Sequence, residues 1–187
     1  MSERLQKFLS KSGLGSRRYC EKLIKDGKVL VNGKIAKIGL NVKFGDEIFF
    51  EEKKVSYSDV STKLILLNKP TGVLSSNKRE KNIPIVFDFL PNNEDERNWI
   101  SIGRLDINTS GLMLFTNDGD FANYCMHPSS NIDREYLVRA RGTFTPEKRK
   151  MLLNGINIDD EKLSFSDVIE GQKKGSNQWF SVCLKSG

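Results

Sequence analysis

Two helical patterns of hydrophobic and polar positions open the chain. Within residues 3–12, apolar side chains recur three and four positions apart, which predicts a short amphipathic helix with an inward face formed by Leu5, Phe8 and Leu9. A second helix is expected over residues 17–26, because Ser16 is a favoured N-cap residue. Gly27 is suited to the position just past the end of that helix.

A hairpin pattern follows the two helices. Two short apolar-rich runs, Val29-Leu30-Val31 and Lys34-Ile35-Ala36, flank the dipeptide Asn32-Gly33, which is typical of a type I′ turn between strands. Two helices and a hairpin predict a compact first domain, which we assign to residues 1–50. Residues 51–62 are polar and aperiodic, and we interpret them as a linker.

Residues 63–187 mix strand and helix patterns, and we expect them to form a second domain. Leu64-Ile65-Leu66-Leu67 is a continuous apolar run typical of a buried strand. Further strands are expected at 112–115, 135–140 and 179–184, and short helices at 121–126 and between Thr145 and Gly155. Strands and helices do not alternate as βαβ units, so we predict an α+β fold rather than a doubly wound sheet.

The positive charge is concentrated near the N-terminus. The formal net charge is +6, yet residues 1–45 alone carry eleven Lys or Arg against three acids, a net of +8. The rest of the chain is therefore close to neutral, at −2. A basic module beside a near-neutral body is the electrostatic pattern of a polyanion binder, whereas a scattered excess would indicate only a solvated surface.

Several classes of site and location are disfavoured by composition. Cys20, Cys125 and Cys183 are far apart and contain no CxxC pair, so we expect neither a disulfide framework nor a thiolate zinc site. His127 is the only histidine, and its place before Pro128 at an expected helix end indicates a structural role. No apolar run reaches the roughly 18 residues of a membrane span. We expect a cytoplasmic protein with no metal, no cofactor and no membrane partner.

One carboxylate stands out as a candidate for chemistry. Asp106 precedes the polar turn Asn108–Gly111, which leads into the hydrophobic run Leu112–Phe115, and Arg104 lies two residues before it. An acid on a loop that a strand holds in place is how a folded protein presents one reactive carboxylate. The alternative pair, Asp118 and Asp120, follows the strand on an Asn-Asp-Gly turn, where Asp is common for turn and capping reasons.

The stretch Gly103–Gly119 closely resembles the catalytic motif of pseudouridine synthases of the RsuA/RluB type. The preceding Lys69-Pro70-Thr71-Gly72, which by itself predicts only a turn, resembles the first motif of the same family. The resemblance implies that Asp106 is the catalytic carboxylate and that Tyr136, in Arg-Glu-Tyr-Leu-Val, is an active-site aromatic. It further implies that Arg104 pairs with Asp106 or enters the RNA stack in place of an extruded base. Whether the carboxylate attacks uracil or ribose stays open.

The order Arg4-Leu5, Gly15-Ser16-Arg17-Arg18 and Gly27–Gly33 resembles the S4 RNA-binding domain. A helix that begins with two arginines can share a phosphate between its N-terminal amides and the guanidinium groups. The resemblance implies RNA contacts from seven residues of this module: Arg4, Lys7, Ser16, Arg17, Arg18, Lys22 and Lys34.

Phe87-Asp88-Phe89-Leu90-Pro91 and Trp99-Ile100 match the RluB branch, which implies large-subunit 23S ribosomal RNA, free or in an assembling particle, as the substrate of a monomeric enzyme. One feature departs from the family pattern. The residues end at Leu184-Lys185-Ser186-Gly187, before a basic Gly-Arg/Lys-x-x-Gln/Glu-Val-Arg-Arg segment, and Ser186 replaces the usual Glu. We therefore expect a truncated domain of low activity. The alternative function is a catalytically inert S4-type RNA-binding protein.

Overall fold

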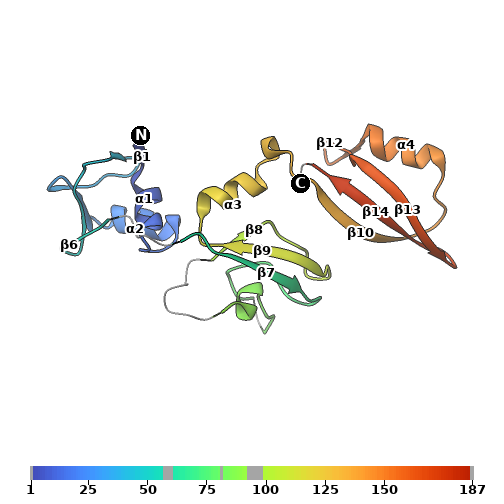
Figure 1. Cartoon of the computed structure of the whole chain (residues 1–187), viewed down its shortest axis with the longest axis horizontal. Helices are drawn as coiled ribbons and strands as arrows, with labels where there is room; N and C mark the ends of the chain where they lie inside the picture. Colours follow the sequence, from blue (N-terminus) through green and yellow to red (C-terminus); the bar gives the residue numbers. More distant parts are fainter. Residues whose placement is uncertain (1, 57–60, 81, 92–98, 186–187) are drawn as a thin grey trace. The chain divides into compact units, whose positions relative to one another are not determined.

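A computed structural model describes residues 2–56, 61–80, 82–91 and 99–185 of the 187-residue chain (Figure 1). Part of the expected linker, residues 57–60, and the sequence departure at Ser186 lie outside the described residues. The chain divides into two compact units, Met1–Asn123 and Tyr124–Gly187. Each is built from helices and antiparallel sheets, and the α+β prediction is confirmed.

The N-terminal part of the first unit packs two helices on short strands. Its elements are β1 (Ser2–Arg4), α1 (Leu5–Lys11), α2 (Arg17–Lys25), β2 (Val29–Val31), β3 (Lys34–Ile35), β4 (Asn41–Lys43), β5 (Ile48–Phe50) and β6 (Lys53–Lys54). Strands β3-β2-β5-β6 form one sheet, and β1-β4 form another. The core comes from the inward faces of both helices and the strands, including Leu5, Leu9, Leu23, Ile24 and Val29.

Most of the helix-cap and turn predictions for this part of the chain are confirmed. The Ser16 hydroxyl accepts a hydrogen bond from the backbone N–H of Tyr19 at 3.2 Å, as an N-cap residue should. Asn32 and Gly33 both have positive φ, at 50° and 76°, which is the backbone of a type I′ turn. The first helix begins later than predicted, at Leu5, because Ser2–Arg4 pair with β4 as an antiparallel strand.

The polar segment after β5 is more ordered than its composition indicates. Glu51 and Glu52 have positive φ and turn the chain, so that β6 pairs back onto β5. Val55 then packs against the core beneath the helices. A short solvated hairpin thus occupies the start of the segment that we interpreted as a linker.

The remainder of the first unit is a three-stranded sheet in the order β7-β9-β8. Its elements are β7 (Leu64–Lys69), the 3-10 helix η1 (Val86–Phe89), β8 (Ile100–Ile102), β9 (Gly111–Thr116) and the first residues of α3 (Gly119–Met126), whose last three residues belong to the second unit. One face packs on a core that includes Val73, Val86, Leu90, Met113 and Phe115.

The exposure of the opposite face of this sheet corrects the prediction of a buried strand at 64–67. Leu64 and Leu66 are 46% and 64% exposed, and Leu112 on the neighbouring β9 is 63% exposed. Successive side chains of a strand point to opposite faces, so only Ile65 and Leu67 turn toward the core. An apolar run alone does not reveal whether one face or both faces of its strand are covered.

The second unit is a long antiparallel sheet with one helix on it. Its elements are η3 (Pro128–Ser130), β10 (Arg134–Arg141), α4 (Pro146–Asn154), β11 (Ile156–Ile158), β12 (Glu161–Leu163), β13 (Asp167–Lys174) and β14 (Asn177–Leu184). The strand order is β10-β14-β13, with β11 and β12 as a separate hairpin. Thr145 caps α4 and Pro146 is its first residue, as predicted.

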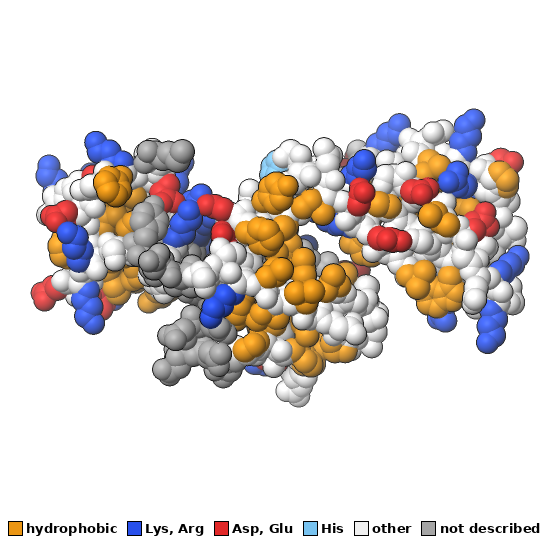
Figure 2. Space-filling model, viewed as in Figure 1, with side chains coloured by type: hydrophobic (Ala, Val, Ile, Leu, Met, Phe, Trp, Pro, Cys, Tyr) orange, Lys and Arg blue, Asp and Glu red, His pale blue; other side chains and the backbone are white. Residues whose placement is uncertain are grey.

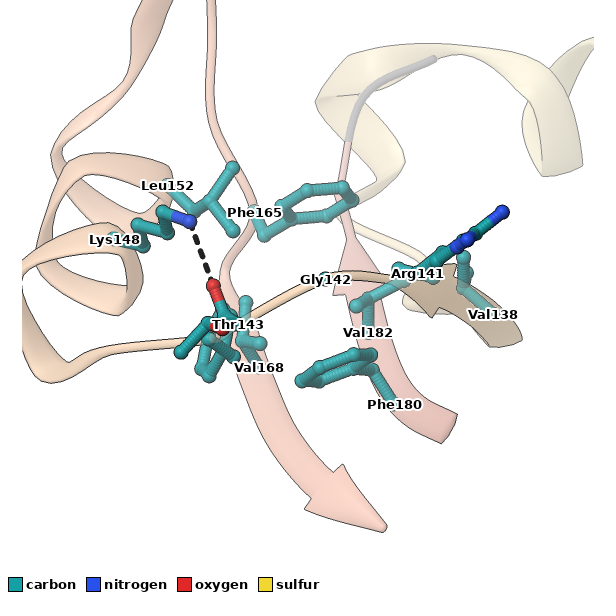
Figure 3. A pocket seen from close by; sticks show the side chains of 12 residues that line it. Val138, Arg141, Gly142, Thr143, Lys148, Leu152, Phe165, Val168, Phe180 and Val182 are labelled. Carbon is teal, nitrogen blue, oxygen red and sulfur yellow. Dashed lines mark hydrogen bonds between the residues drawn. The ribbon is translucent and has the colours of Figure 1, made fainter. Parts of the chain in front are cut away.

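The core of the second unit lies between α4 and the sheet. Val168, Phe180 and Val182 are buried there, and Leu152 and Leu153 of α4 pack against them. A pocket of about 260 Å³ opens beside this core, with Phe165 and Phe180 on its walls (Figure 3). Its polar lining includes Lys148, whose ammonium donates to the carbonyl oxygen of Thr143 at 2.6 Å.

Candidate active site

The candidate catalytic loop, residues 103–110, connects β8 to β9 in the first unit. Its side chains alternate in exposure: Arg104, Asp106, Asn108 and Ser110 are exposed, while Leu105, Ile107 and Thr109 are half-buried. Leu105 also packs against the core of Val86 and Phe115. The half-buried residues therefore anchor the loop, and the side chains of Arg104 and Asp106 between them both reach solvent.

Lys69, the last residue of β7, fixes the backbone of this loop. Its side chain is fully buried, and its ammonium lies within hydrogen-bond distance of four backbone carbonyl oxygens: Pro70 (3.0 Å), Asp106 (3.0 Å), Ile107 (3.4 Å) and Thr109 (2.7 Å). An ammonium has three N–H donors, so these carbonyls share them. Three of the four acceptors belong to the catalytic loop.

The charge of Lys69 is compensated by dipoles and by one nearby carboxylate. Burial lowers the pKa of Lys69, because it disfavours the charged form, and the negative charge of Asp106 opposes that shift. A buried ammonium would be costly without hydrogen-bond partners. The carbonyl cage supplies these partners, so that Lys69 both organises the loop and adds positive potential beside Asp106.

Two further contacts hold the residues around Asp106. The Ser75 hydroxyl donates to the carbonyl oxygen of Leu105 at 2.6 Å and accepts from the Leu105 N–H at 3.2 Å. The Gly72 N–H donates to the carbonyl oxygen of Ile107 at 2.7 Å. The backbone on both sides of Asp106 is thus bonded to the segment that follows β7.

Sequence patterns do not predict the role of Lys69. They indicate only a turn and a family resemblance at Lys69-Pro70-Thr71-Gly72, and they give the lysine no function. The sequence did offer one signal, a charged residue at an inward position of an apolar strand. Because Lys is almost never fully buried without partners, such a position indicates that the lysine binds other groups. The acceptors are backbone carbonyls far along the chain, so residue types alone could not identify them.

The other expected catalytic residues are located as follows. Arg104 is exposed, and among the described residues no salt bridge joins it to Asp106. Tyr136 lies on β10 of the second unit, where it is half-buried, pairs with Val182 and packs against the core beneath α4. The structure thus brings Asp106 together with Lys69 and Ser75, whereas Tyr136 belongs to the second unit.

The carboxylates Asp118 and Asp120 have other roles. Asp118 accepts hydrogen bonds from the N–H groups of Asp120 and Phe121 at 2.8 and 3.1 Å, which caps the start of α3. Asp120 pairs with Lys7 at 2.7 Å and with Lys11 at 2.9 Å. The hydrogen bonds from Lys7 and Lys11 hold the pKa of Asp120 below its usual value.

The expected RNA-contacting residues fall on one small module. Ser16, Arg17 and Arg18 form the exposed start of α2, and Lys22 is exposed one turn later. Arg4 and Lys34 are exposed on β1 and β3, and Lys7 is half-buried. Both Lys7 and Arg17 pair with Asp120, at 2.7 and 3.8 Å. Anions favour a helix N-terminus, and the two arginines there add charge and donors for a phosphate.

Two family models match the chain. The model described as "RNA pseudouridylate synthase" matches residues 63–186, and the model described as "S4 domain" matches residues 3–48. The chain belongs to the RNA pseudouridylate synthase family.

Among the residues that the structure describes, no helix is long and apolar enough to cross a membrane, and no cluster of three or more His, Cys, Asp or Glu is suited to hold a metal ion.

Several curated relatives are similar along the whole chain. Proteins named "Ribosomal large subunit pseudouridine synthase B" are 45% identical in Buchnera aphidicola, 40% in Pseudomonas aeruginosa and 41% in Vibrio cholerae, each over 100% of this chain. The chain spans 77%, 49% and 59% of these relatives, respectively. A solved structure titled "Crystal structure of pseudouridylate synthase" matches 98% of this chain and 77% of its own, with a TM-score of 0.58 and 27% identity.

Proposed function

We propose that this chain carries the RNA-binding and catalytic residues of a ribosomal RNA pseudouridine synthase, with Asp106 as the catalytic carboxylate. The observation that carries the proposal is that Asp106 is exposed while the backbone around it is held by the buried ammonium of Lys69 and by Ser75. A preorganised loop of this kind aims a carboxylate at a bound nucleotide without a cost of ordering at the moment of reaction.

The reaction fits the residues at this site. The N1–C1′ bond of uridine breaks, a C5–C1′ bond forms, C5 loses a proton and N1 gains one. The change is an isomerisation, so its balance requires no redox cofactor and no ATP. It requires a carboxylate that attacks the nucleotide or assists loss of the base, and a base for the C5 proton. Asp106 takes the first role, by attack on uracil or on ribose.

The remaining site residues receive supporting roles. Tyr136 stacks on the uracil ring and its oxygen assists removal of the C5 proton. Arg104, exposed on the same loop, pairs with the carboxylate or fills the space that the extruded base leaves in the RNA stack. Extrusion costs a few kcal/mol, and a loop, bulge or junction in the RNA lowers that cost.

The basic module supplies affinity. We divide the chain into an S4 domain at residues 1–50, a linker at 51–62 and a catalytic domain from residue 63. Seven residues of the S4 domain contact RNA phosphates: Arg4, Lys7, Ser16, Arg17, Arg18, Lys22 and Lys34. This binding raises the local concentration of substrate at the catalytic loop. The relatives named for the ribosomal large subunit support 23S ribosomal RNA as the substrate. We place the enzyme in the cytoplasm as a monomer.

The decisive experiment is tritium release from large-subunit ribosomal RNA labelled at uridine C5. It is run on this chain and on the same chain with Asp106→Asn. Asparagine keeps the shape of the side chain but has neither the charge nor the nucleophilicity, so release should stop while RNA affinity is unchanged.

A matched control is Asp118→Asn, because the α3 cap requires only a side-chain oxygen acceptor. Release by this variant at the parent rate is expected. Release by Asp106→Asn would contradict the assignment of Asp106. Tight RNA binding without release from the parent protein would instead favour the inert RNA-binding alternative.

A further inference from the structure

The second unit has a sheet face that its helix does not cover. Along β14, Gln178, Phe180 and Val182 are buried toward α4, and the alternating residues Trp179 and Ser181 therefore point to the opposite face. The ring of Trp179 is 38% exposed there. β14 buries its other aromatic residue, Phe180, whereas the indole of Trp179 stays partly open to solvent and available for a contact.

The surroundings leave part of the Trp179 ring open. Arg139 on β10 pairs with Trp179, and its guanidinium carbon lies 5.7 Å from the ring centroid. On the other neighbouring strand, β13, the nearby residue is Gly171. A Cβ at that position would lie 3.1 Å from the carbonyl oxygen of Trp179 and 3.4 Å from its Cβ. The glycine thus keeps the β13 side of the tryptophan free of a side chain.

Positive charge gathers at the same end of the sheet. Arg139 and Arg141 on β10, and Lys173 and Lys174 on β13, are all exposed. In the described part of the chain, no salt bridge joins any of these four cations to a carboxylate, whereas Arg149 on α4 pairs with Asp167. Figure 2 shows Lys and Arg side chains around this end of the unit.

From this arrangement we infer that the face around Trp179 binds an unpaired RNA segment, with one base stacked on the indole and the neighbouring phosphates bound by Arg139, Arg141 and Lys174. The inference rests on the proposed function, and it adds a second RNA surface in the unit that lacks the S4 module. A planar ring with an open side fits a nucleobase, because every base has a π face. The guanidinium of Arg139, which lies over the ring, and that of Arg141, two residues further along β10, fit phosphate oxygens.

Intrinsic fluorescence tests this surface directly. The chain has two tryptophans, so Trp99→Phe leaves Trp179 as the sole indole reporter. This variant is titrated with a short oligoadenylate while binding is followed in parallel by the anisotropy of a labelled copy of the RNA. Stacking should quench the emission of Trp179 in a saturable manner, with the same midpoint as the anisotropy change.

Substitutions sharpen the test. Starting from a protein whose S4 contacts are weakened by Arg17→Ala and Arg18→Ala, Trp179→Ala should lower the remaining affinity about tenfold, and Trp179→Phe should restore most of it. In the same background, Arg139→Gln with Arg141→Gln should weaken binding and flatten its salt dependence. Lys150→Gln with Lys162→Gln, two exposed lysines elsewhere in the unit, is the charge-matched control and should change neither.

The possible failures are distinguishable. Anisotropy that reports bound RNA while Trp179 emission stays constant would overturn the surface and leave the proposed function intact. Equal quenching by polyglutamate would also overturn it, because a generic polyanion has no base to stack. If oligoadenylate binds by neither readout, the surface fails, and the proposed function is decided separately by tritium release from ribosomal RNA.

Discussion

The ammonium of Lys69 donates a hydrogen bond to the backbone carbonyl of Asp106 at 3.0 Å. The contact joins the end of β7 to a loop that follows β8, so two segments far apart in the sequence share one buried cation. This bond fixes the backbone of Asp106, the proposed catalytic residue, while its carboxylate stays exposed to solvent. The geometry of the loop and the stability of the sheet are therefore coupled.

Lys69→Met should destabilise the protein by about 2–4 kcal/mol, because carbonyls of the loop lose their buried donor while the apolar stem is kept. Urea unfolding followed by circular dichroism measures the loss. Tritium release should fall much more than RNA affinity, since Asp106 is displaced rather than removed. Lys78→Met, at an exposed position, is the control and should leave both unchanged. Wild-type turnover by Lys69→Met would show that the cage is dispensable.

Ser75→Ala should cost about 1 kcal/mol of stability, because both backbone groups of Leu105 lose their side-chain partner. We expect a lower kcat with little change in KM, as Leu105 directly precedes Asp106. Steady-state kinetics separate the two constants. Ser110→Ala, on an exposed residue of the same loop, should behave as the parent protein. A raised KM at unchanged kcat would assign Ser75 to substrate binding instead.

Replacing Arg17 and Arg18 by Ala should weaken RNA binding and reduce the slope of log affinity against log salt by about 1 for each phosphate that is no longer neutralised. The exposed start of α2 offers both arginines to one phosphate, so the slope should fall by about 1. Fluorescence anisotropy over a salt series gives the slope. Lys53→Gln with Lys54→Gln on β6, the strand that pairs with β5, removes the same charge and should have a smaller effect. Equal slopes for the two double variants would argue against a specific site at α2.

The ion pairs of Asp120 predict an acid-dependent loss of stability. The pKa of Asp120 is held below its usual value, with the Lys7 hydrogen bond as the largest cause and Lys11 next. A carboxylate with a depressed folded-state pKa stabilises the protein fully above its unfolded pKa of about 4, and this contribution is lost as pH falls through the folded value. The side chain is 49% exposed, so the effect should be small.

Urea midpoints measured at neutral pH and at pH values below the unfolded pKa test this contribution. Asp120→Asn should be less stable than the parent near neutrality, and the difference should shrink in acid. Asp133→Asn, an exposed acid in the second unit, serves as the matched control. A difference that persists unchanged in acid would mean that Asp120 acts through packing and not through its charge.

Features that depend on neighbouring residues could be predicted from the sequence alone. Ser16 and Thr145 cap helices, and Asn32-Gly33 forms its turn, because each uses bonds or backbone angles within a few positions. Asp106 could be singled out as a loop acid next to a strand for the same reason. The α+β class followed from the order of these local patterns.

Features that depend on distant segments were settled by tertiary packing. Ser2–Arg4 left the helical pattern because Asn41–Lys43 pair with them, and Leu66 is exposed because of which face of its sheet packs on the core. Lys69 became the organiser of the catalytic loop because its carbonyl acceptors reach it from residues 106–109. Burial and long-range hydrogen bonds arise from the packing of segments far apart in the chain, and no local pattern of residue types encodes them.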